Sequence, residues 1–91
     1  MRIQRRDKLK IYSDLLFALR SEPITEKIVL TRVQFRIGVP YDRLKTYIEE
    51  LMNLGLIQDE TSLKLTEKGI QYLREYEIVL DFMERMGLKY K

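Results

Sequence analysis

The feature that most constrains the fold is the stretch "YDRLKTYIEELMNLGLI" at residues 41–57. Its apolar residues follow the i, i+3, i+4, i+7 spacing of one buried helix face: Leu44, Tyr47, Ile48 and Leu51. Gly55 can adopt the left-handed conformation that closes a helix C-terminus, and an apolar pair follows it at 56–57. We therefore expect a helix that ends at residue 53 or 54 and passes directly into an extended segment.

The residues after this helix predict a β-hairpin. The apolar pair at 56–57 begins one strand, "ETS" at 60–62 forms the turn, and "LKLT" at 63–66 alternates as the returning strand. Thr66 then has the position of a cap for a final helix.

The residues before it predict two further helices. The first runs over 6–20, where apolar residues recur at helical spacing, and Pro23 cannot continue it. The run "IVL" at 28–30 favours a short strand, followed by a helix over 32–37 that Thr31 caps. One continuous helix from Thr25 to Ile37 is the alternative. "GVPY" at 38–41 predicts a tight turn into the helix after it.

The last helix is expected over 67–86, about 30 Å long, which exceeds what so small a body needs to cover. An apolar stripe with 3-4 spacing that continues past the domain usually meets a copy of itself. We therefore predict a homodimer through this helix, with an interface formed by Tyr72, Tyr76, Val79, Leu80, Met83 and Met86. The alternative is that the helix only folds back onto the helix at 6–20.

Composition limits the chemistry of the chain. Its 91 residues suit one compact body, which we divide into 1–66 with a basic N-terminal arm and 67–91 with the long helix and tail. There is no cysteine and no histidine, so thiolate sites and the commonest metal ligand and general base are missing. We expect no enzyme activity, no cofactor, no metal and no small-molecule substrate. No apolar run reaches the length of a membrane span, so we expect a cytoplasmic protein.

The charges are unevenly distributed. Residues 1–10 carry five cations and one acid, and residues 32–45 carry four cations and one acid. Residues 49–60 carry four acids and no cation. Cations gathered in two places, with a pI near 9.2, favour a polyanionic partner, and a merely solvated, uneven surface is the alternative.

The expected order of elements resembles a known family. A helix-turn-helix followed at once by a hairpin is the winged-helix arrangement. "YIEELMNLGLI" at 47–57 and "LKLTEKGIQYL" at 63–73 resemble small archaeal winged-helix proteins, in particular the ten-a type of chromatin-associated DNA-binding proteins. The resemblance covers about 31–86 and implies a mainly α fold with a small β-hairpin. It also implies an antiparallel coiled-coil homodimer through the last helix.

The resemblance further implies binding to double-stranded DNA, with the helix at 41–53 in the major groove and a nucleoid-associated role, as transcriptional regulator or chromatin-type protein. Residues at the start of such a helix face base edges, and neighbouring cations contact phosphates. The candidate DNA-binding residues are Arg5, Arg6, Arg32, Arg36, Tyr41, Arg43, Lys45, Thr46 and Lys64.

Acidic residues in the same region leave a second function open. Glu49 and Glu50 would repel phosphate, and the hairpin turn "DETS" is acidic. The cations of the helix at 41–53 could equally be a solvated face, with Lys45 paired to Glu49. The alternative function is therefore a winged-helix protein–protein interaction module that binds no nucleic acid.

Overall fold

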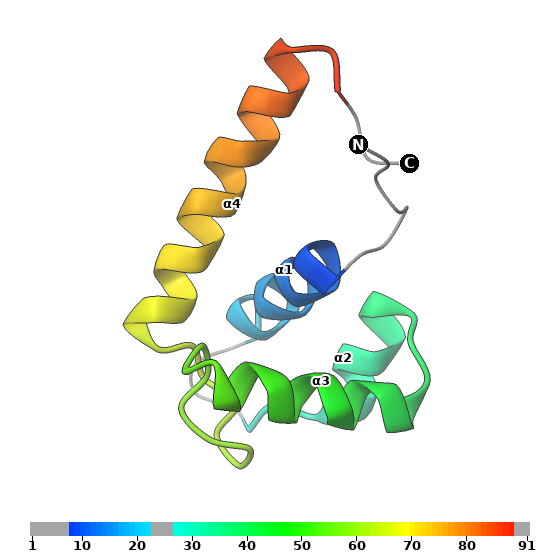
Figure 1. Ribbon diagram of the computed structural model, residues 1–91. Coiled ribbons are helices and arrows are strands. Elements are labelled where there is room, and N and C mark those ends of the chain that lie inside the picture. The colour runs from blue at the N-terminus through cyan, green and yellow to red at the C-terminus, as the bar shows by residue number, and fades with distance from the viewer. Residues whose placement is uncertain (1–7, 23–26, 89–91) are drawn as a thin grey trace.

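The structure, a computed structural model, describes residues 8–22 and 27–88. Within these ranges the chain forms four helices (Figure 1): α1 Lys8–Arg20, α2 Leu30–Ile37, α3 Tyr41–Asn53 and α4 Glu67–Arg85. In this described part, no helix is long and apolar enough to cross a membrane.

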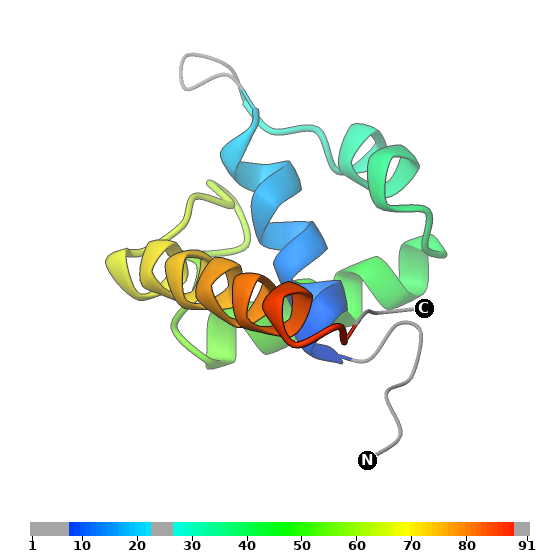
Figure 2. The same ribbon diagram turned by 90° about the horizontal axis from the view of Figure 1, so that it is seen from above.

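Helix α1 is the centre of the molecule and contacts both α2 and α4 (Figures 1 and 2). Its fully buried leucines Leu15 and Leu16 meet Val33 of α2, Leu44 and Leu51 of α3, and further apolar residues in one core. Burial of large aliphatic side chains contributes about 1.5–3 kcal/mol each, so this shared core is the main force that holds the helices together.

The segment before α2 differs from the expected strand. Ile28 and Val29 pair with no strand in the described residues, and Leu30 already belongs to α2. The α2 hydrogen bonds begin at the Val29 carbonyl, which accepts from Arg32 N at 3.1 Å, so Thr31 lies inside the helix and does not cap it. The extended backbone of Val29 also contradicts a continuous helix through this point, and residues 23–26 lie outside the described ranges.

Helix α3 ends as the sequence predicts. Its last helical residue is Asn53, and Gly55 has φ +77°. Gly55 N donates to the Met52 carbonyl at 3.0 Å, and Leu56 N donates to the Leu51 carbonyl at 2.9 Å. These two bonds form a Schellman motif, in which the left-handed residue lets the chain satisfy the final carbonyls of the helix.

The expected β-hairpin is not formed, because residues 56–66 make a single antiparallel bridge, between Ile57 and Leu65, and no strand. Leu56 and Ile57 are both buried, so the alternation of a half-exposed strand fails at its first two residues. On the returning side, Leu63 has φ +57° and packs into the core, which removes it from extended geometry. We call residues 56–66 the wing loop.

The start of α4 is joined to the end of α3. Thr66 caps α4 as predicted, since its Oγ1 accepts from Gly69 N at 3.1 Å. The same hydroxyl donates to the Gly55 carbonyl at 2.6 Å, and Lys68 Nζ donates to the Leu54 carbonyl at 2.7 Å. Thr66 N also donates to the Leu56 carbonyl at 3.1 Å, so both ends of the wing loop are held together at its base.

Helix α4 is the longest element, and its last turns extend past α1 (Figure 1). Its helical residues end at Arg85, one residue before the predicted end. Gly87, with φ +78°, closes it in a second Schellman motif with Leu88. The first half of α4 packs on α1, whereas its second half has large apolar side chains in solvent.

Candidate nucleic-acid interface

The first two turns of α3 form the exposed polar surface that the sequence predicts. Tyr41 is 42% exposed, and Arg43, Lys45 and Thr46 are also exposed. The buried residues of α3 hold the helix against the core by its other face, so these four side chains point outward from a rigid element.

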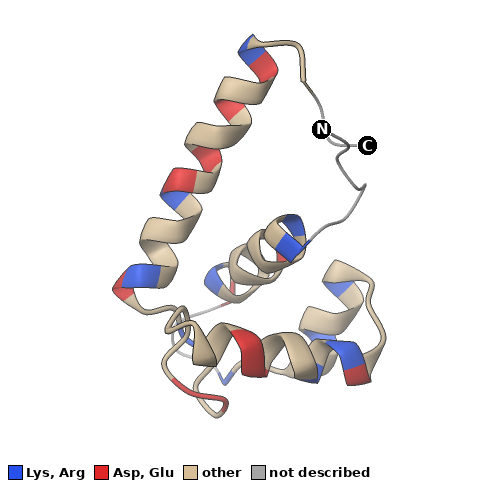
Figure 3. Ribbon diagram, viewed as in Figure 1, with Lys and Arg blue, Asp and Glu red and all other residues tan. Residues whose placement is uncertain are grey.

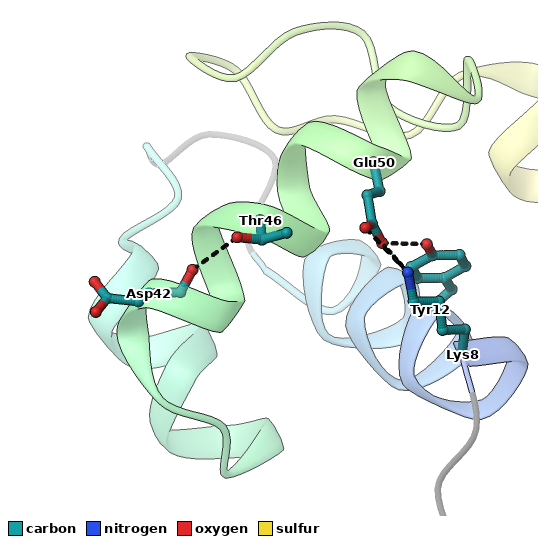
Figure 4. A network of polar contacts seen from close by, with 5 residues as sticks. All are labelled: Lys8, Tyr12, Asp42, Thr46 and Glu50. Atoms are coloured by element: carbon teal, nitrogen blue, oxygen red, sulfur yellow. Dashed lines mark hydrogen bonds and ion pairs between the residues drawn. The ribbon is translucent and has the colours of Figure 1, made fainter.

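Two of these side chains have contacts within α3. Lys45 Nζ lies 6.0 Å from the centroid of the Tyr41 ring, a cation–π arrangement, and not beside Glu49 as the alternative interpretation expects. Thr46 Oγ1 donates to the Asp42 carbonyl at 3.2 Å (Figure 4). While that bond is intact, the Thr46 hydroxyl offers only its lone pairs to a ligand. A phosphate oxygen needs a donor, so it would require the hydroxyl to rotate.

Glu50 differs from the expectation that it repels phosphate together with Glu49. It is half-buried and points to α1. Its carboxylate accepts hydrogen bonds from Lys8 Nζ at 3.1 and 3.2 Å and from the Tyr12 hydroxyl (Figure 4). Glu50 is therefore neutralised by α1 and does not present an unpaired charge beside the outer face of α3.

The contacts between α1 and α3 change the proton affinity of both partners. Hydrogen bonds from Tyr12 and then from Lys8 lower the pKa of the Glu50 carboxyl. Burial, followed by the hydrogen bond to Glu50, raises the pKa of Tyr12 to about 12. Both shifts are consequences of the arrangement found here, in which a neutral phenol donates to a carboxylate. The ring of Tyr12 also packs edge-to-face on Tyr47 of α3, with centroids 6.3 Å apart.

The two arginines of α2 have different environments. Arg32 Nη2 lies 2.6 Å and its Nε 2.8 Å from Oε1 of Glu22, whose residue is 8% exposed. Removing Arg32 would leave this buried carboxylate uncompensated, so Arg32 has a structural role that the sequence does not reveal. Arg36 is exposed at the edge of a hollow between α1 and α2, so its guanidinium is the more accessible of the two.

The wing loop is acidic at its tip. Asp59 Oδ1 accepts from Thr61 N at 2.8 Å and from Ser62 N at 2.7 Å, and these backbone bonds lower the pKa of the carboxyl. Asp59 therefore shapes the turn as an Asx-type acceptor. Glu60 and Lys64 are exposed beside it. Of the remaining candidates, Arg5 and Arg6 lie outside the described residues.

The charges separate along α3 (Figure 3). The cations of α2 and of the start of α3 lie in the part of the molecule that surrounds the turn between these helices, with Asp42 as one acid among them. The other acidic residues of this region follow in the second half of α3 and in the wing loop. This separation makes the beginning of α3 the part best suited to approach a polyanion.

The expected dimer stripe on α4 is divided between two surroundings. Tyr76 and Met83 are buried in the single chain, and the Tyr72 hydroxyl donates to the Leu9 carbonyl at 2.8 Å. Val79, Leu80 and Met86 are exposed. Tyr72, Tyr76 and Met83 face α1. A partner helix would therefore contact mainly the three exposed residues of the stripe and their exposed neighbours.

Two exposed apolar residues were missed in the sequence, Ile78 and Phe35. Ile78 lies on α4 one turn before Phe82, a residue that the sequence does place on a wider apolar stripe, and the i, i+4 spacing of the two could have shown it. On α2, Phe35 is 91% exposed. Its position opposite Val33 and Ile37 on the wheel is the only signal for it.

A family model described as winged helix-turn-helix matches residues 5–84, which is most of the chain. No curated protein and no solved structure matches.

Proposed function

Because the chain belongs to the winged helix-turn-helix family, we propose that it binds double-stranded DNA with the first turns of α3 in the major groove. The observation that carries the proposal is the exposed group at the start of α3, in which Arg43 and Lys45 stand beside Tyr41 and Thr46. Arginine pairs with guanine through two parallel hydrogen bonds, so Arg43 is the proposed base-reading residue.

The position of Glu50 supports this mode of binding. Its carboxylate is held by Lys8 and Tyr12 at the α1 side, so Glu49 and Asp42 are the acids left on the outer side of α3. Asp42 lies in the first turn, where the helix dipole favours a negative charge. A tilted approach, in which only the first turns enter the groove, keeps Glu49 away from phosphate.

We further propose that the protein acts as a homodimer through the second half of α4. The support is the set of exposed apolar residues in the second half of α4 and just after it: Ile78, Val79, Leu80, Phe82, Met86 and Leu88. Four of them, Ile78, Val79, Phe82 and Met86, fall within a sector of about 100° at helical spacing, and an exposed apolar sector on a helix that extends past its own core is typical of an interface. Two copies joined in this way would present two α3 helices to one duplex.

The cellular role that we propose is that of a nucleoid-associated protein, either a transcriptional regulator or a chromatin-type binder. Arg36, Lys64 and the basic arm with Arg5 and Arg6 would contact phosphates and strengthen binding to every sequence alike. Arg43 would carry whatever sequence preference exists. Comparison of one random and several defined duplexes separates a regulator, which prefers some sequences, from a chromatin-type binder, which does not.

The test is a fluorescence-anisotropy titration of duplex DNA at several salt concentrations, with the mass measured by light scattering. The affinity for duplex DNA should fall steeply as the salt concentration rises. Light scattering should give twice the mass of one chain. Arg43→Ala should weaken binding to a preferred duplex and relax the sequence preference, because a base contact carries the discrimination. Arg74→Ala is the matched control, because it removes an exposed cation from α4, away from α3. Equal loss in both variants would show that α3 does not read the DNA.

Absence of duplex binding at low salt would favour the second function, a module that binds a protein. The supporting feature is the acidic surface of Glu49, Asp59 and Glu60, which suits a basic partner. In that case, substitution of Glu60 by lysine should abolish capture of the partner, whereas Arg43→Ala should leave it unchanged.

A further inference from the structure

Phe35 is the most exposed large apolar residue among those described. Its side chain on α2 is 91% exposed, whereas the neighbouring helix positions Val33 and Ile37 are buried in the core. Phe35 therefore contributes nothing to packing within the chain. A fully solvated phenyl ring loses the apolar burial that would normally stabilise it, so a role outside the fold is the simplest reason for its presence.

The ring borders a hollow at the turn between α2 and α3. This hollow has a volume of about 360 Å³ and is lined by Phe35 together with Thr31, Gln34, Gly38 and Val39. Gly38, with φ +68°, ends α2, and only Val39 and Pro40 separate it from the start of α3. The exposed ring thus lies at the corner of the helix-turn-helix, close along the chain to the proposed base-reading helix.

The charge around this corner selects the chemistry of the partner. Residues 27–46 carry five cations, Lys27, Arg32, Arg36, Arg43 and Lys45, and one acid, Asp42. Arg36 follows Phe35 on α2, a helix without acidic residues, whereas Arg32, one turn earlier, is already paired with Glu22. A second copy of the same surface would be repelled by like charge, so the occupant must be polyanionic and still offer apolar surface.

We propose that Phe35 is an apolar DNA contact that packs against the deoxyribose and groove edge of the duplex, between the phosphates held near Arg36 and the start of α3. The inference rests on the proposed DNA binding and adds to it a residue whose contribution does not depend on salt. A duplex fits both requirements, because its sugars and thymine methyl groups lie directly beside its phosphates. In helix-turn-helix proteins the helix before the reader crosses the DNA backbone, which is where α2 would then lie.

The experiment compares Phe35→Ala with Arg36→Ala in duplex titrations over a range of salt concentrations. Phe35→Ala should bind about tenfold more weakly at every salt concentration with an unchanged slope, because an apolar contact releases no counterions. Arg36→Ala should reduce the slope by about 0.9 for each protomer bound to the duplex. Leu54→Ala is the control, because it removes an exposed apolar side chain at the acidic end of α3.

The outcomes separate this inference from the proposed function. If the unsubstituted protein does not bind DNA, the proposed function fails first. If it binds and Phe35→Ala binds equally well, only the role of Phe35 is overturned. Since the ring is solvated, Phe35→Ala should leave the melting temperature and the mass in light scattering unchanged. A changed mass would assign the ring to self-association, and loss of an acidic protein partner with intact DNA binding would assign it to a protein contact. Either result contradicts the inference.

Discussion

Substitution of Gly69 by alanine tests how closely α4 must approach the wing loop. A Cβ at this position would lie 2.2 Å from the Leu56 carbonyl oxygen and 3.4 Å from Leu65 Cβ. Contacts under 3.0 Å essentially never occur for a real Cβ, so α4 and Leu56 would have to separate from 2.2 to at least 3.0 Å, by about 0.8 Å. The obstacle is backbone, which cannot rotate away as a side chain can.

This displacement has a predictable free-energy cost. The hydrogen bonds across the same junction, from Thr66 to Leu56 and Gly55 and from Lys68 to Leu54, would all be stretched. Overpacking alone typically costs about 1–3 kcal/mol, and each weakened hydrogen bond adds about 0.5–1.5 kcal/mol. The higher helix propensity of alanine returns at most about 1 kcal/mol. The net expectation is a loss of about 2 kcal/mol or more.

Thermal and urea unfolding followed by circular dichroism measure this loss. At fixed protein concentration, Gly69→Ala should lower the melting temperature by about 10 °C or more, since 1 kcal/mol corresponds to about 4–8 °C in a domain of this size. Glu77→Ala, an exposed position of α4, is the control and should change stability by less than about 0.5 kcal/mol. If Gly69→Ala were as stable as the parent or more stable, helix propensity would dominate and the close approach would be refuted.

Four further predictions concern long-range contacts and the dimer. The Tyr12 contribution to stability is complete below pH 10 and is lost as the pH rises toward about 12. The unfolding free energy of Tyr12→Phe should therefore fall less than that of the parent protein between these two pH values. A parallel fall in both proteins would contradict this. The Glu50 contribution is complete above pH 4.5 and lost as the pH falls through the lowered pKa, so Glu50→Gln should weaken acid sensitivity in urea titrations. Arg32→Ala should lower the free energy of unfolding by roughly 1–3 kcal/mol in the same assay, because it leaves Glu22 unpaired. Adding Glu22→Gln to this variant should restore part of that loss. An unchanged unfolding midpoint for Arg32→Ala would show that the pair is dispensable. Phe82→Asp should halve the mass in light scattering without lowering the helix content per chain, and an unchanged mass would exclude α4 as the interface.

The sequence by itself determined the features whose causes are local. The apolar spacing of α3, the left-handed Gly55 after it and the Thr66 cap of α4 were all predicted, and the structure confirms them. Each depends on residues within a few positions of one another, where backbone sterics and helix geometry leave few alternatives. The winged helix-turn-helix assignment follows from their order, and the family match confirms it.

Only the tertiary structure decided the features that depend on distant residues. Glu50 meets Tyr12 across 38 positions of sequence, and Gly69 meets the Leu56 carbonyl across the wing loop. The wing loop lacks strands because the core takes Leu56, Ile57 and Leu63 as buried residues, which overrides their local preference for extended pairing. Periodicity gives the direction of a side chain relative to its own helix, but the elements packed around that helix decide which of these directions are solvent.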